Sequence, residues 1–319
     1  MFNIVQKRRW FFVLSALVIV PGLAIMIFST ISTGAPFQLS IDFLGGSIYE
    51  LKFDDAGATE DGLRQVFTAF GDDNVIIQQI GQPSDFRWSV RADFHEVSTT
   101  NQILASLGEL AAVNRDSFRA ETVSATIGQE VTRSALAAVA VGALVITGFI
   151  VIAFRQVPNA IRYGICAIAA MIHDILLVMG VMSLLGLLLG WEIDALFLTA
   201  VLTVVGFSVQ DSIVVFDRIR ENIPKHLGEP YETIVNRSIW ETIHRSLATQ
   251  LNAFFIMIAI LLFGGETVKQ FIAILFIGLL SGTYSSIFTA VPLLVAWEKG
   301  ELPFIGRRGV MEEAASATA

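Results

Sequence analysis

The sequence has 319 residues, of which 54% are hydrophobic and 16% are charged, and its mean hydropathy is +0.66. This composition excludes an ordinary water-soluble globular protein and indicates an integral membrane protein. The formal net charge of −8 is uneven, because residues 33–130 contain fifteen acidic and six basic residues whereas the remainder has a net charge of +1. The split predicts one soluble acidic domain on a nearly neutral membrane body, and it argues against a nucleic-acid partner.

Six long apolar segments predict six transmembrane helices. The first, residues 10–32, follows a basic N-terminal segment (residues 1–9) and exceeds the length of a signal-peptide core. Small residues near the end of this segment would also be compatible with cleavage as a signal peptide. We interpret the segment as an uncleaved signal anchor. The other predicted transmembrane segments are residues 134–154, 163–191, 195–216, 246–265 and 270–297. The single cysteine, Cys166, lies in the third apolar segment, where we expect a small buried apolar side chain.

Lysine and arginine residues in the short loops predict the orientation of these helices. One side of the membrane receives thirteen of them: Lys7, Arg8, Arg9, Arg155, Arg162, Arg218, Arg220, Lys225, Arg237, Arg245, Lys299, Arg307 and Arg308. The other short loops receive only Lys269. We therefore expect both termini, the link 217–245 and the tail 298–319 in the cytoplasm, with residues 33–130 exported. The end of the tail, residues 309–319, is predicted to be disordered.

The exported segment is predicted to be an α+β domain. Alternating apolar residues predict strands over 47–53, 74–80, 86–92 and 117–127, and helical spacing predicts helices over 58–70 and 98–112. Thr59 and Ser98 are the expected N-caps. The order β-α-β-β-α-β is the ferredoxin-like arrangement. We expect His95, the only histidine of this segment, on the surface, and the segment shows no metal-binding or nucleophile motif.

The fourth transmembrane segment contains the most informative polar group. Asp211 lies inside the apolar run together with Ser208, Gln210 and Ser212. A carboxylate in a membrane-spanning helix costs about 2.5–3.5 kcal/mol and usually marks an ion or proton path. The alternative is that Asp211 lies close enough to the cytoplasmic end to reach water.

Two further groups of polar residues accompany Asp211. Residues 231–244 have the spacing of an interfacial amphipathic helix. It leads into Arg245, Thr249 and Asn252, which share one helix face that would meet Asp211, unless Arg245 only extends to the lipid headgroups. His173 and Asp174 interrupt the third segment, either as a relay or as hydrogen-bonding groups between helices.

Two motifs resemble the SecF family of bacterial protein-export membrane subunits. One is IDFLGG at residues 41–46, and the other is VGFSVQDSIVVFDRIREN at residues 205–222. The motif residues with expected structural roles are Asp42, Gly45, Gly46, Asp217, Arg218, Arg220, Glu221 and Asn222. The resemblance covers essentially the whole chain, although Leu44 and Gln210 stand where the family usually has threonine and asparagine.

The resemblance implies a multi-pass protein of the bacterial plasma membrane, akin to resistance-nodulation-division exporters, that uses the proton motive force in protein translocation. It implies a SecD-like six-span partner, a SecYEG-type channel and a translocating polypeptide as partners within the lipid bilayer. It also implies that Asp211 carries the proton and that Arg245 is its partner. No cofactor, metal or catalytic residue is expected, because neither metal-ligand spacings nor a nucleotide-binding glycine loop occur.

Three other functions fit parts of the pattern. Half of a proton-coupled small-molecule exporter would share the relay but would normally need both six-span halves on one chain. An intramembrane aspartyl protease would use Asp174 and Asp211 as a dyad, but neither aspartate has a Gly-x-Gly-Asp context. A purely structural stabiliser of the channel would need no buried carboxylate.

Overall fold

The computed structural model describes residues 3–155 and 159–301. The predicted disordered segment 309–319 lies outside the described residues, as do Arg307 and Arg308. The chain forms two compact units, one of Met1–Gln38 with Ala138–Ala319 and one of Leu39–Ala137, and each is described separately.

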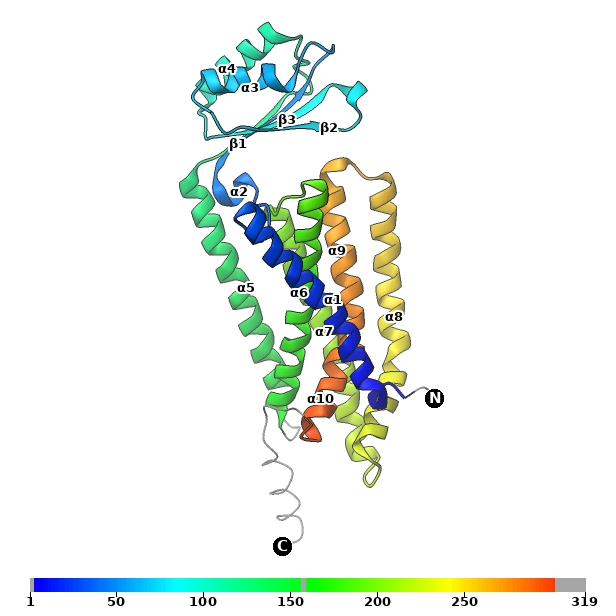
Figure 1. The fold of residues 1–319 in the computed structure, drawn as a ribbon. Coiled ribbons are helices and arrows are strands. Elements are labelled where there is room, and N and C mark those ends of the chain that lie inside the picture. The colour runs from blue at the N-terminus through cyan, green and yellow to red at the C-terminus, as the bar shows by residue number, and fades with distance from the viewer. Residues whose placement is uncertain (1–2, 156–158, 302–319) are drawn as a thin grey trace. The chain divides into compact units, whose positions relative to one another are not determined.

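The first unit is a helical bundle (Figure 1). Six helical segments in the described residues are long and apolar enough to cross a membrane, which confirms the predicted number. Five are the single helices α1 (Arg8–Thr33), α5 (Ala125–Ala153), α6 (Ala160–Leu189), α7 (Ala195–Lys225) and α8 (Tyr231–Phe263), and a short turn, η1 (Val5–Lys7), precedes α1. The sixth consists of α9 (Glu266–Ser285), η3 (Ser286–Ala290) and α10 (Val291–Glu298).

At two places the structure differs from the predicted element boundaries, one in α8 and one at the start of α5. The predicted interfacial helix over 231–244 is not separate, because α8 runs unbroken to Phe263 through a sequence without glycine or proline. At the start of α5, residues 125–127 are helical instead of extended. There the Ser124 hydroxyl accepts a hydrogen bond from the Ile127 amide at 3.4 Å, as an N-cap does.

Glycines bring the central helices of the bundle close together. A β-carbon added at Gly282 of α9 would lie 3.1 Å from the β-carbon of Ser208 on α7, and one at Gly278 would collide with Val204. Gly278 and Gly282 form a Gly-x-x-x-Gly motif, which permits close approach of helix backbones in membranes. The α7–α9 contact is therefore encoded by small residues at a four-residue spacing.

A π-helical turn divides the sixth segment. The turn, η3, precedes Pro292 in the first turn of α10. Proline donates no backbone hydrogen bond and its ring crowds the carbonyl one turn earlier, so a widened turn relieves the conflict. The last residue of α9, directly before this turn, is Ser285.

The second unit contains a four-stranded antiparallel sheet in the order β2-β3-β1-β4. Its strands are β1 (Gly46–Lys52), β2 (Ile76–Ile80), β3 (Arg87–Ala92) and β4 (Arg119–Val123), and its main helices are α3 (Glu60–Ala69) and α4 (Val97–Leu110), with short helices α2 (Ile41–Leu44) and η2 (Pro83–Asp85). The predicted β-α-β-β-α-β succession is the observed one. The helices pack on one face of the sheet over a core that includes Tyr49, Leu63, Phe67, Val90 and Leu107.

Two local predictions for this unit are wrong. His95 is not on the surface but only 8% exposed, because its Nε2 lies 3.2 Å from the Asp72 carboxylate and its Nδ1 3.1 Å from the Tyr49 hydroxyl. Burial raises the pKa of Asp72, and the His95 imidazole acts in the opposite direction. Ser98 is not the N-cap of α4, because the helix begins one residue earlier and Glu96 occupies the cap position. Thr59 caps α3 as predicted, accepting a hydrogen bond from the Gly62 amide.

The Gly-Gly pair of the first motif makes a turn that only glycine fits. Gly45 and Gly46 have φ values of +80° and +123°, and a β-carbon at Gly45 would lie 2.8 Å from the Cα of Ala125. Asp42 lies in α2 just before this turn, and its amide donates to the Ser40 hydroxyl at 3.1 Å. The motif thus packs the start of β1 against the first residue of α5.

Candidate functional site

Asp211 lies midway along α7 and is 5% exposed. Its Oδ2 accepts a hydrogen bond of 2.7 Å from the side-chain amide of Gln250 on α8. Three buried polar atoms around this contact, the hydroxyls of Ser212 and Ser246 and the Oε1 of Gln250, have no hydrogen-bond partner among the described residues. The site therefore combines a buried carboxylate with unused hydrogen-bonding capacity.

Arg245, the predicted partner of Asp211, is exposed on α8. Within the described parts of the chain its guanidinium group forms no hydrogen bond or ion pair, and Asp211 is joined to Gln250 instead. Arg245 lines a charged groove of about 250 Å³ between α7 and α8. The groove is also lined by Val214, Asp217, Arg218, Glu221, Glu241 and Thr242, and Val214 is one helical turn from Asp211.

The other residues of the predicted polar face, Thr249 and Asn252, are also exposed, as is Gln210 beside Asp211 on α7. The Thr249 hydroxyl donates to the carbonyl of Arg245 one turn earlier. The inward face of α8 instead carries Thr242, Ser246 and Gln250. The spacing of residues 245, 249 and 252 on one face was predicted correctly, but this face lies one position away from the one that meets α7.

Asp174 on α6 is the most completely buried carboxylate of the bundle's described residues, with 0% exposure. Its Oδ1 accepts a hydrogen bond from Ser281 at 2.6 Å and lies 3.2 Å from the Nδ1 of His173. Its Oδ2 accepts hydrogen bonds from Ser208 at 2.6 Å and Ser285 at 2.7 Å. Three helices, α6, α7 and α9, therefore converge on one side chain.

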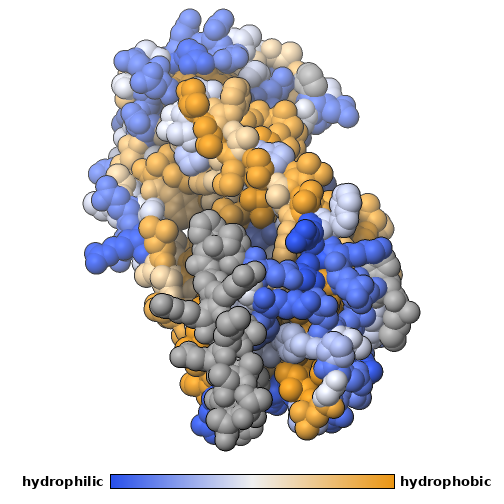
Figure 2. Space-filling view, turned by 60° about the horizontal axis from the view of Figure 1, so that its bottom comes forward, coloured by the Kyte–Doolittle hydropathy of each residue, from blue (hydrophilic) through white to orange (hydrophobic). Residues whose placement is uncertain are grey.

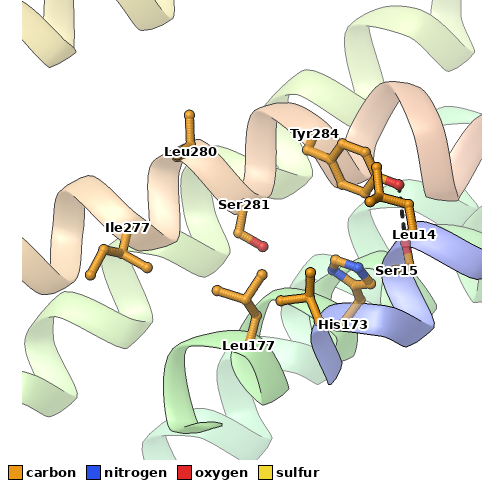
Figure 3. Close-up of a pocket in the computed structure, with 9 residues that line it drawn as sticks. Leu14, Ser15, His173, Leu177, Ile277, Leu280, Ser281 and Tyr284 are labelled. Atoms are coloured by element: carbon orange, nitrogen blue, oxygen red, sulfur yellow. Dashed lines mark hydrogen bonds between the residues drawn. The ribbon is translucent and has the colours of Figure 1, made fainter. Parts of the chain in front are cut away.

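A cavity of about 250 Å³ adjoins this cluster between α1, α6 and α9 (Figure 3). Its walls are mostly aliphatic, and the polar groups on them are His173, Ser281, Tyr284 and Ser15. The His173 ring stacks on Tyr284 with a centroid distance of 6.0 Å. The Nε2 atom of His173 is buried and has no hydrogen-bond partner among the residues that the structure describes.

The charged end of the second motif joins α7 to its neighbours. Arg218 contacts Glu241 of α8 at 2.6 Å and Glu221 at 2.8 Å, and the Asn222 amide donates to Glu241 at 2.7 Å. Arg220 pairs with Asp217 at 2.7 Å and donates to the carbonyl of Ala153 on α5 at 3.2 Å. These residues hold helices together and lie outside the buried clusters.

Sequence reasoning missed four residues of the buried clusters: Ser246, Gln250, Ser281 and Ser285. Each pair is spaced by four residues within an apolar helix, so each pair lies on one helix face. This four-residue spacing could have indicated a polar helix face. Isolated serines are common in apolar helices, however, so the spacing did not indicate which side chain they contact.

Comparisons with known proteins agree with the motifs. The chain matches the family described as protein export membrane protein SecD/SecF, C-terminal, over residues 102–300, and the SecD/SecF GG motif over residues 30–56. It is 43% identical to protein translocase subunit SecF of Anaerolinea thermophila, covering 94% of this chain and 96% of the relative. It is 40% identical to the subunit of the same name from Thermobaculum terrenum, covering 99% of this chain and all of the relative.

Solved structures show the same fold. A crystal structure of SecDF, a translocon-associated membrane protein from Thermus thermophilus, superposes with a TM-score of 0.76 at 31% identity over 93% of this chain. A SecDF crystal structure in a super-membrane-facing form gives a TM-score of 0.65 at 29% identity over the whole chain. The chain spans 39% and 40% of the length of these two SecDF chains. The chain is a multi-pass membrane protein that belongs to the SecF family of protein translocase subunits and has its role in protein export.

Proposed function

We propose that this SecF subunit couples the proton motive force to protein export through Asp211. The observation that carries the proposal is a carboxylate in the middle of a membrane helix whose hydrogen-bonding partner is a neutral amide. In such surroundings the charged form is poorly compensated, so taking up a proton from one side and releasing it to the other changes the energy of local packing. A proton crossing the membrane supplies about 2.3 kcal/mol per 100 mV of potential.

The groove between α7 and α8 supports access to Asp211 from the cytoplasm. Its charged lining fits water, and Val214, one of its lining residues, is one turn from the carboxylate along α7. The positive-inside distribution of lysine and arginine supports a cytoplasmic position for this end of α7 and for the termini, and an exported position for the α+β unit.

Arg245 supplies the second charge of the proposed relay. In the structure it is free of ion pairs within the described residues and lies on the helix that holds Gln250. We assign it as the partner that replaces the Gln250 amide when Asp211 is ionised, because an adjacent arginine stabilises a carboxylate in a membrane. The Ser246 hydroxyl, buried on the same face of α8 as Gln250, fits this alternation as a further neutral group beside the carboxylate.

The exposed polar face of α7 and α8 supports a second six-span half as partner. Gln210, Arg245, Thr249 and Asn252 are too polar for lipid, and a SecD-like half would cover them. Together the two halves would act beside a SecYEG-type channel, where the exported unit holds or pulls the translocating polypeptide. Neither a small-molecule exporter nor a passive stabiliser is favoured by the SecF relatives.

The test is the substitution Asp211→Asn in the chain co-expressed with its SecD-like partner. Asparagine has nearly the same shape and cannot carry a proton, so we expect normal assembly with loss of coupled proton flux and of the gradient-dependent part of export. The measurements are co-purification of the partner, and proton flux and export rate in membrane vesicles with an imposed gradient.

Asp211→Glu is the matched control, because it keeps a carboxylate and should retain part of the flux. Export that still responds to the gradient in the correctly assembled Asp211→Asn complex would refute the proposal and favour a scaffolding role.

A further inference from the structure

The hydrogen bonds around Asp174 indicate which protonation state of its carboxyl group the surroundings favour. Each carboxylate oxygen has two polar neighbours, and the three hydroxyls lie at 2.6–2.7 Å. Distances of this kind are typical of hydroxyl groups that donate to an ionised carboxylate. Donors that surround the charged form favour it, so the surroundings of Asp174 hold it as an anion even at 0% exposure.

An ionised Asp174 also fixes the tautomer of His173. The Nδ1 atom lies 3.2 Å from Oδ1 and must donate, because an ionised carboxylate can only accept. In the neutral ring, Nε2 then carries a bare lone pair, and this is the atom without a partner in the described structure. An aspartate that orients a histidine in this way also stabilises the imidazolium.

Asp174 and Asp211 therefore differ in where a proton would be held. Asp211 has one amide donor and would take a proton on its own oxygen. Asp174 has its oxygens occupied by hydroxyls, so the proton-accepting atom of its cluster is the Nε2 of His173. Protonation there changes the net charge of the pair from −1 to zero, which a low-dielectric bundle favours.

In the described structure, hydroxyls and one titratable side chain, Tyr284, face the pair. Ser15 of α1 lies 3.4 Å from the Tyr284 hydroxyl and 3.3 Å from Thr289 of η3, and Tyr284 donates to the Phe11 carbonyl at 2.9 Å. The Tyr284 ring stacks on His173, and Asp211 lies one turn beyond Ser208 along α7. The hydroxyls of Ser15, Tyr284 and Thr289 and the Phe11 carbonyl are therefore hydrogen-bonded neighbours that lead from the cavity toward the N-terminal end of α1.

We propose that His173, oriented by an ionised Asp174, is a second proton-carrying group of the bundle and exchanges its proton at Nε2 through the cavity between α1, α6 and α9. The inference rests on the proposed proton-coupled function and adds a group that holds a proton in that cycle. Asp174 is a positioning residue in this scheme and keeps its charge throughout.

The test is nitrogen-15 NMR of histidine in the full chain, purified with its partner in lipid. The chain has only four histidines, so substitution of the other three assigns the His173 signals. We expect the Nδ1–H tautomer at alkaline pH and a doubly protonated ring at acidic pH. Asp174→Asn should leave His173 neutral under conditions in which the wild-type ring is doubly protonated.

Ser183→Ala is the matched control, because Ser183 is also a buried residue of α6 but donates to the Pro36 carbonyl, away from the pair. It should leave the His173 signals unchanged. In a transport assay, His173→Asn retains a donor near the position of Nδ1 but cannot titrate, so we expect loss of proton flux with normal assembly.

Two NMR results would overturn the inference: a His173 ring in the Nε2–H tautomer, or a ring that stays neutral across the pH range. Full proton flux in His173→Asn would also overturn it, since a merely structural role requires only the Nδ1 contact. The proposed function fails separately, if Asp211→Asn retains gradient-dependent export while His173 still titrates.

Discussion

At the scale of single residues, the described part of the bundle buries two carboxylates, each held by neutral hydrogen-bond donors from neighbouring helices. Asp174 and Asp211 stand out because a carboxylate within an apolar run is rare. Their partners Ser281, Ser285 and Gln250 do not stand out, since serine and glutamine enter apolar helices for several reasons. Which hydroxyl reaches which carboxylate depends on the rotation of each helix about its axis, and residue spacing alone fixes only the face.

Arg245 illustrates the same limit. Its helical spacing with Thr249 and Asn252 is as predicted, but the direction of that face depends on which residues of α8 pack against α7. Gln250 donates to Asp211 of α7 and Ser246 is buried one turn earlier on the same face, so the face that carries Arg245 does not contact α7 at Asp211.

An ion-pair network joins the chain ends of the bundle and gives a residue-level prediction. Arg8 contacts Glu301 at 2.6 Å and Glu232 at 2.9 Å. Figure 2, which turns the lower end of the Figure 1 view forward, shows many hydrophilic residues gathered there. The hydrogen bond from Arg8 lowers the pKa of Glu301. A lowered pKa means that this pair stabilises the fold above the ordinary glutamate pKa, and that the contribution is lost as pH falls through the lowered value.

We therefore expect Glu301→Gln to lower stability at neutral pH by no more than about 1 kcal/mol, because the pair is partly exposed. The difference from wild type should vanish in acid. Thermal unfolding of the purified chain at several pH values measures it, and a difference that grows toward acid would contradict the assignment.

At the scale of elements, helix number and the α+β succession were predictable, because hydrophobic periodicity and length encode them. The positions of the helix ends were less predictable from the sequence. The α8 helix passes through a polar segment that resembles a loop by composition, since nothing in it breaks a helix. Helix pairing was also beyond the sequence reading, although the Gly-x-x-x-Gly motif of α9 contained the signal.

The prediction at this scale concerns Gly282. The substitution Gly282→Val places a side chain where the β-carbon of Ser208 lies 3.1 Å away, so it should separate α7 from α9 and pull Ser208 from Asp174. We expect a loss of about 1–3 kcal/mol, as in other overpacked interiors, measured by thermal unfolding in detergent.

Gly142→Val on α5 is the control, because nothing described lies within 4 Å of a β-carbon there. Equal stability of the two variants would show that the α7–α9 contact contributes little.

At the scale of the whole molecule, the bundle has outward surfaces of two kinds. The helices α1 and α5 expose large apolar side chains, among them Leu17 and Leu144, as expected for lipid contact. The helices α7 and α8 expose Gln210, Arg245, Thr249 and Asn252. Val214 lines both the groove that contains Arg245 and a pocket between α5 and α7 that contains Gln210, so Gln210 and Arg245 border adjoining surfaces of α7.

A photo-crosslinking residue in place of Thr249 should therefore form an adduct with the co-expressed SecD-like partner. The same residue in place of Leu17, which is 67% exposed on α1, should label lipid instead. Mass analysis of the adducts distinguishes the two, and adducts to the partner from position 17 alone would contradict the proposed interface.

The hydroxyl shell of Asp174 has a mechanical consequence. Its donors come from α7 and α9, so pulling either helix away from α6 would strand a negative charge in the bilayer without compensation. We therefore expect α6, α7 and α9 to move together in any rearrangement that keeps the shell intact. The helices that contribute no donor to the shell, among them α5 and α8, are the ones whose displacement leaves it unbroken.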